Sequence, residues 1–189
     1  MQYQYVIIMV GMIIVLLQNA ISKLSNGNKN IDKYVITTLK QYTFWNLLLI
    51  LINVLFYRDL YFEIFIFINT TVIFITYYIL HMAHRDKVKT FPNIPPFFNE
   101  ADIEISMFLV HALPFVYYFF KMMENYEKIK IFYNIGFETA LFNVMWVMLN
   151  FFSFDPSSVY FSIEDEHLYF IWVLMIFLHF AIGYLFIHS

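Results

Sequence analysis

Long apolar runs without charged residues recur along the whole chain. Six stretches of 16 to 23 residues contain no Asp, Glu, Lys or Arg. A helix that crosses a membrane needs about 20 mostly apolar residues. We therefore predict six transmembrane helices, at residues 1–22, 41–57, 64–84, 105–120, 139–154 and 167–189. The fifth is expected to begin earlier, near Ile131, which would bring Glu138 into or close to the membrane.

The pattern favours one all-α domain over residues 1–189. Backbone polar groups inside lipid must pair within the protein, so spanning segments are helices or closed barrels. Barrel strands would alternate polar and apolar residues, and these stretches do not. The first stretch has no positively charged start and is too long for a typical signal peptide, so we interpret it as a retained helix. The predicted architecture is a polytopic bundle of six helices.

Composition agrees with a membrane protein and excludes several other classes. Hydrophobic residues make up 61% of the chain and charged residues 13%, against about 45–50% and about 25% in soluble domains. This argues against a soluble enzyme, a disordered chain and a nucleic-acid-binding protein. The chain has no cysteine, which excludes disulfides and thiolate chemistry. We expect no cofactor and no metal site.

Charges in the predicted loops give a modest indication of orientation. One side of the predicted bundle carries seven Lys and Arg residues and the other four. Because cytoplasmic loops are enriched in positive residues, the side with seven is predicted to face the cytoplasm. The pattern suits the endoplasmic reticulum or the plasma membrane equally well.

Polar side chains recur on one face of two predicted helices. Thr43, Asn46 and Asn53 share a face of the second helix, and Asn143 and Asn150 share a face of the fifth. Most such residues in membranes bond to neighbouring helices, for gains of about 0.6–2 kcal/mol each. Lipid offers their amides no partners, so we predict that both faces point into the bundle.

Among the ionisable residues, His111 is the leading candidate for a functional role. It lies well inside the fourth predicted helix, where ionisable residues often mark sites. Pro114 lacks the N–H that would bond to the carbonyl of Val110, so a kink is expected beside the imidazole. Glu138 is a weaker candidate, since it can lie at headgroup level.

The other histidines receive no role in this interpretation. His81 and His84 have a spacing seen in metal sites, but no third ligand is near them in sequence. His179 and His188 are interpreted as lying near a helix end or facing lipid.

The alternating topology allows Thr43 and His111 to meet. The second and fourth predicted helices enter the membrane from the same side. Both residues lie in the first half of their helices. We therefore expect them in one leaflet at comparable depth. Glu138 would enter from the opposite side, which disfavours a pair with His111.

Three segments resemble the androgen-induced-protein family, which includes the androgen-dependent TFPI-regulating protein and fungal FAR-type members. The first is LKQYTFWNLLLILINVLFY at residues 39–57. The second is HALPF at 111–115, after a proline-rich loop. The third is the region 142–161, where FNVMWVML leads through a turn into VYF. Their order and spacing fit the family over nearly the whole chain.

This resemblance implies six transmembrane helices and an intramembrane threonine hydrolase that cleaves fatty acid esters of hydroxy fatty acids. The family's nucleophile corresponds to Thr43 and its histidine to His111. The chain departs from the family in the context of the histidine, SMFLVHALPF, and in the acidic residues at 164–166.

Physical chemistry permits these roles. A threonine hydroxyl needs a neighbouring base to act as a nucleophile, and imidazole suits neutral pH. Asn46, one turn after Thr43, is a candidate donor to the developing oxyanion. The expected partners are the lipid bilayer and a lipid ester.

Two other functions remain open on the sequence alone. One is a small channel or transporter, in which His111, Glu138 and the Asn and Thr faces form a polar path. The other is a membrane scaffold without catalysis. A path would be polar through the full thickness of the membrane, whereas the ionisable groups here are few and are predicted to lie in separate leaflets.

Overall fold

The computed structural model describes residues 41–56, 59–83, 105, 108–125, 134–153 and 165–188, and all of their regular secondary structure is helical. The elements are α3 (Tyr42–Leu55), α4 (Leu60–Ala83), the π-helical turn η1 (Phe108–Ala112), α7 (Leu113–Glu124), α9 (Ile135–Ser153) and α10 (Asp165–His188). The all-α class is therefore confirmed for this part of the chain. The first predicted membrane helix lies outside it.

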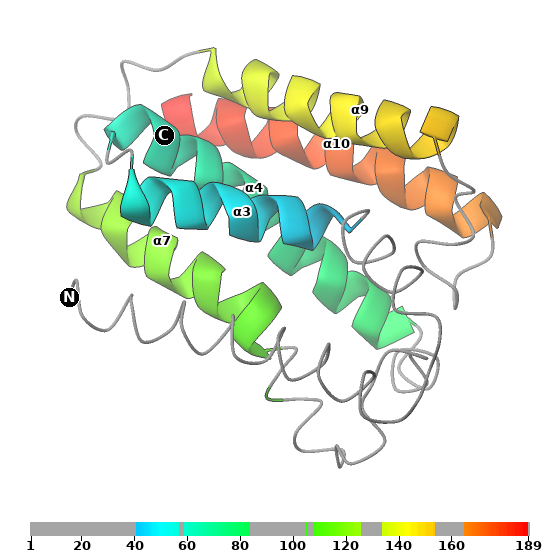
Figure 1. The fold of residues 1–189 in the computed structure, drawn as a ribbon, viewed down its shortest axis with the longest axis horizontal. Coiled ribbons are helices and arrows are strands. Elements are labelled where there is room, and N and C mark those ends of the chain that lie inside the picture. Colours follow the sequence, from blue (N-terminus) through cyan, green and yellow to red (C-terminus); the bar gives the residue numbers. More distant parts are fainter. Residues whose placement is uncertain are drawn as a thin grey trace.

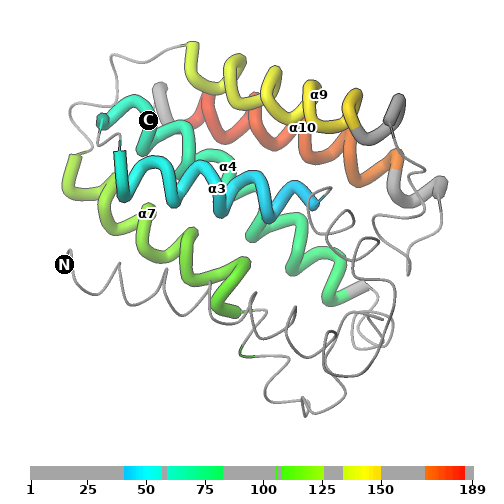
Figure 2. Tube along the Cα trace, viewed as in Figure 1, coloured from blue at the N-terminus to red at the C-terminus, as the bar shows by residue number. Residues whose placement is uncertain are grey.

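Consecutive α-helices in the described part run in opposite directions, as the ribbon and the tube show (Figures 1 and 2). α4 is the central helix and contacts α3, α7, η1, α9 and α10. Its residues are apolar nearly all round, which is typical of a helix surrounded by other helices. The two threonines in its middle, Thr70 and Thr71, satisfy their hydroxyls by donating to the carbonyl of Phe67.

The helices coincide with the predicted segments except where charged residues continue them. α4 begins at Leu60, so that Glu63 lies inside the helix, and α7 continues to Glu124, past Lys121. Glu63 and Lys121 form a salt bridge between these two helices. A paired charge can be buried where an isolated one cannot, which explains why both helices extend beyond their charge-free runs.

Loss of one partner of this salt bridge should destabilise the bundle. Glu63 is nearly buried and the Lys121 side chain is 29% exposed. We expect Lys121→Met to cost about 1–3 kcal/mol, because the Glu63 carboxylate would be left without its cation. Adding Glu63→Gln should recover most of that loss. The free energy of unfolding in mixed micelles measures both effects, and equal losses in the single and double variants would contradict the pairing.

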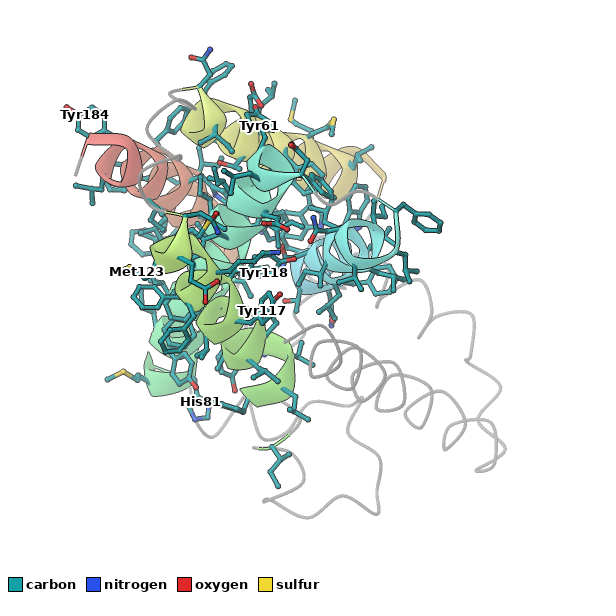
Figure 3. All side chains as sticks on the ribbon, turned by 90° about the vertical axis from the view of Figure 1, so that its left-hand side faces the viewer. Tyr61, His81, Tyr117, Tyr118, Met123 and Tyr184 are labelled. Atoms are coloured by element: carbon teal, nitrogen blue, oxygen red, sulfur yellow. The ribbon has the colours of Figure 1, made fainter. Side chains whose placement is uncertain are left out.

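Several polar side chains are buried inside the bundle and many large apolar side chains are exposed on its outside. The buried polar residues include Asn46, Asn69, Asn143 and His179, each at most 3% exposed. Large apolar residues instead cover the outer surfaces of α3, α7, α9 and α10. Figure 3 shows the side chains around the bundle, including Tyr184, which is 64% exposed on α10. Such a surface suits hydrocarbon better than water.

One described helix, over Leu60–Met82 in α4, is long and apolar enough by itself to cross a membrane. Shorter apolar segments occupy Tyr42–Leu55, Ile135–Leu149 and Tyr169–Leu185. Membrane association therefore has weak direct support from helix length.

Two glycines allow α9 and α10 to approach closely. A Cβ atom added at Gly183 would lie 2.3 Å from the Cα of Gly136, and one added at Gly136 would lie 2.9 Å from the Cα of Gly183. Both obstacles are backbone atoms, which no side-chain rotation can move. Small residues of this kind let transmembrane helices pack backbone to backbone.

Candidate functional site

The first turns of α3 carry two of the three predicted site residues. Thr43 is half-buried, and Asn46 is 3% exposed one turn later. The buried Oδ1 of Asn46 has no hydrogen-bond partner in the described part of the protein. A buried amide oxygen without a partner is unusual in native proteins and calls for an explanation.

The prediction that the two asparagine faces point inward is confirmed for the residues whose side chains are described. Asn46 and Asn53 on α3 are each 3% exposed, and Asn143 on α9 is fully buried. Asn53 accepts a hydrogen bond of 3.2 Å from the hydroxyl of Tyr118 on α7. The side chain of Asn150 is not among those that the structure describes.

His111 lies in the π-helical turn η1, directly before α7. Pro114, in the first turn of α7, has no N–H for the carbonyl of Val110, and the chain accommodates this break as a wider turn. The predicted distortion beside His111 is thus observed. The imidazole stacks on the Tyr77 ring of α4, with the ring centroids 4.0 Å apart and the planes 11° apart. Tyr77 also stacks with His81, which Figure 3 labels on α4.

Thr43 and His111 lie toward the same end of the bundle. α3 and α7 run in the same direction (Figure 1) and are joined by the Asn53–Tyr118 hydrogen bond. Counting back at 1.5 Å per residue places Thr43 about 15 Å and His111 about 10 Å from that bond. The two helices diverge toward their beginnings in Figure 1. Comparable depth therefore agrees with the expectation, while direct pairing stays a prediction.

A polar cluster in the bundle core joins three helices. The hydroxyl of Tyr42 on α3 donates to Oδ1 of Asn69 on α4. The same hydroxyl lies 3.1 Å from Nε2 of His179 on α10. Tyr42, Asn69 and His179 are all at most 1% exposed. We call these three residues the core cluster.

The surrounding backbone fixes the orientation of the core cluster. The Nδ2 amide of Asn69 donates to the carbonyl of Phe65, at 2.8 Å, so its Oδ1 faces Tyr42. Nδ1 of His179 lies 2.7 Å from the carbonyl of Met175. A carbonyl can only accept, so Nδ1 carries a hydrogen and Nε2 of the neutral ring is an acceptor. Nε2 and Asn69 Oδ1 are therefore two acceptors around the single hydroxyl hydrogen of Tyr42.

The structure corrects the interpretation of His179 as a residue near a helix end or facing lipid. It lies 14 residues after the first residue of α10 and 9 before the last. A position so deep within a predicted span was itself a signal of a functional or structural role. The signal was missed because its neighbours are apolar in every direction, so the sequence pattern does not mark an inner face.

The remaining candidates are placed as follows. Glu138 is half-buried in the first turn of α9. His81 lies near the end of α4, and residue 84 lies outside the description. Within the described residues there is no group of three side chains able to hold a metal ion.

Comparisons of the chain with models of protein families, with curated proteins and with solved structures find no match.

Proposed function

We propose that the chain is a multi-pass membrane protein with six transmembrane helices. The distribution of polarity supports this proposal, because amides and an imidazole lie inside the bundle and large apolar side chains lie outside it. The alternating direction of the described helices (Figure 1) is also what successive crossings require. The segments expected to cross besides α4 are α3, η1 with α7, α9, α10 and residues 1–22.

We further propose that the protein hydrolyses lipid esters, with fatty acid esters of hydroxy fatty acids as the substrate class. Thr43 is the nucleophile, His111 is its general base and Asn46 stabilises the oxyanion. Thr43 and His111 are half-buried, so both can be reached from the bundle surface. A lipid ester would approach them sideways from the bilayer.

The observation that carries this proposal is the buried amide of Asn46, one turn from Thr43, whose Oδ1 has no hydrogen-bond partner in the described part of the chain. Oδ1 can only accept a hydrogen bond, so the atom proposed to face the ester oxygen is Nδ2, the donor of the same amide. A donor placed before the reaction stabilises negative charge that develops on the oxygen.

The proposed reaction has two steps. In the first, His111 takes the Thr43 proton as the hydroxyl oxygen attacks the ester carbon, and the alcohol leaves with a proton from the imidazole. In the second, water attacks the acyl-threonine with His111 again as base. The carboxylic acid is released and the Thr43 hydroxyl is restored.

Labelling with a fluorophosphonate probe tests the nucleophile directly. We expect the purified protein to be labelled and Thr43→Ala to lose the label. Thr71→Ala is the matched control, because the Thr71 hydroxyl already donates to the carbonyl of Phe67. It should keep the label. Equal labelling of the protein and Thr43→Ala would refute a Thr43 nucleophile.

A proton or ion transporter is the second candidate. The core cluster favours it, since Tyr42 and His179 are titratable side chains joined by a hydrogen bond deep inside the bundle. Proton flux into liposomes that requires His179, with no fluorophosphonate labelling, would favour this function over hydrolysis.

A further inference from the structure

Asn143 on α9 is a buried amide whose hydrogen-bonding capacity is unused. It is 0% exposed, and neither its Nδ2 nor its Oδ1 has a hydrogen-bond partner in the described part of the chain. Buried polar groups in native proteins almost always have a hydrogen-bond partner, because leaving them unpaired costs free energy. Two unpaired atoms on one side chain therefore indicate a ligand that can both accept and donate hydrogen bonds.

The surroundings of Asn143 connect it to the beginning of α3. Phe142, which precedes it, and Trp146, about one turn later on α9, contact the Tyr42 ring at centroid distances of 6.0 and 5.0 Å. The Asn143 amide lies near the Tyr42 hydroxyl without meeting hydrogen-bond geometry. Asn46 lies one turn after Tyr42 on the same buried face of α3.

The unpaired atoms of Asn143 and Asn46 are suited to a small, neutral ligand. Asn143 offers one donor group and one acceptor, and Asn46 adds an acceptor that has no partner in the described residues. An acyl chain could satisfy none of them. A cation would find few oxygen ligands and no carboxylate among these three side chains. Water donates and accepts, and a buried water typically makes about three hydrogen bonds.

We propose that Asn143, Asn46 and the Tyr42 hydroxyl bind water in the core of the bundle. The core cluster holds the Tyr42 hydroxyl in place through Asn69 and His179. The aromatic rings of Phe142 and Trp146 on α9 pack against the Tyr42 ring.

The role that we assign to this water, as the nucleophile of the second step, rests on the proposed ester hydrolysis. Asn46 is three residues after Thr43, so the site adjoins the proposed nucleophile. Water that leaves the site toward Thr43 would attack the acyl carbon. Its oxygen forms the new bond, the bond between the Thr43 oxygen and the acyl carbon breaks, and the threonine oxygen regains a proton. Asn143 is then a positioning residue for the second step of hydrolysis.

Hydroxyl-radical footprinting by brief X-ray exposure of the full chain in nanodiscs tests for bound water. Radicals formed from a bound water oxidise the aromatic side chains beside it. Tyr42 and Trp146 are at most 1% exposed, so they should resist oxidation unless water is bound beside them. We expect both to be oxidised, and their oxidation rates to fall at least about fivefold in Asn143→Leu, which keeps the side-chain shape but has no hydrogen-bonding atoms. Absence of oxidation at both residues, or equal rates in Asn143→Leu, would overturn the proposal.

A matched variant and a kinetic readout separate this site from general structural effects. Asn53→Leu makes the same substitution at a buried asparagine whose partner is Tyr118. It should leave oxidation of Tyr42 and Trp146 unchanged. In ester hydrolysis, Asn143→Leu should lower kcat several-fold with a retained burst of the first product, because acyl-enzyme formation needs no water. Oxidation that depends on Asn143 without labelling of Thr43 would keep the water site and refute the hydrolase.

Discussion

Replacing Thr43 or His111 by alanine is expected to lower lipid-ester hydrolysis by about 10²–10⁴-fold in each case. Thr43→Ala removes the attacking oxygen, and His111→Ala removes the base that takes its proton. The double variant should lose little more than either single variant, because two groups that act as one unit have non-additive effects. Hydrolysis of a long-chain hydroxy-acid ester in liposomes, at matched protein levels, measures all three.

Conservative variants distinguish chemistry from folding at this site. Thr43→Ser keeps the hydroxyl and should retain part of the activity. Asn46→Ala should lose less than either catalytic variant, as expected for one of several contributions to oxyanion binding. Thr→Ala raises helix propensity, so unfolding of α3 does not explain a loss in Thr43→Ala. Full hydrolysis by Thr43→Ala would remove the threonine-hydrolase proposal and leave the transporter.

Introduction of valine at Gly183 should be the most destabilising substitution in the described helices. Its Cβ would meet the Cα of Gly136 at 2.3 Å and the backbone nitrogen of that residue at 3.0 Å. Since neither atom can move alone, α9 and α10 would have to separate along their contact. Overpacking of this kind typically costs about 1–3 kcal/mol, and the backbone obstacle places Gly183→Val at or above the upper end. Gly136→Val should follow it closely.

The free energy of unfolding, measured on the purified protein with increasing concentrations of a denaturing detergent, reports this effect. Leu185→Val provides the control, because it places the same β-branched residue two positions later on α10, where the side chain is 65% exposed. It should unfold close to the unmodified protein. Equal stability of Gly183→Val and Leu185→Val would mean that α9 and α10 do not pack through their glycines.

The sequence was sufficient to predict most of the local structure in the described region. The charge-free runs predicted where α3, α4, α7, α9 and α10 lie, because a helix in lipid needs an uninterrupted apolar length. The inward direction of Asn46, Asn53 and Asn143 also followed from the sequence, since lipid leaves an amide unpaired. Pro114 predicted the distortion beside His111 for an equally local reason, the missing N–H.

Contacts between distant residues required the tertiary structure. Tyr42 and His179 are 137 residues apart in sequence, and Glu63 and Lys121 are 58 apart. Neither pair can be inferred from periodicity, because periodicity describes the faces of one helix and says nothing about its rotation against another. The apolar residues all round α10 hid the inner position of His179 for the same reason. Which polar groups meet inside this bundle depends on how the helices cross, and the crossing is set by packing such as the contact between Gly136 and Gly183.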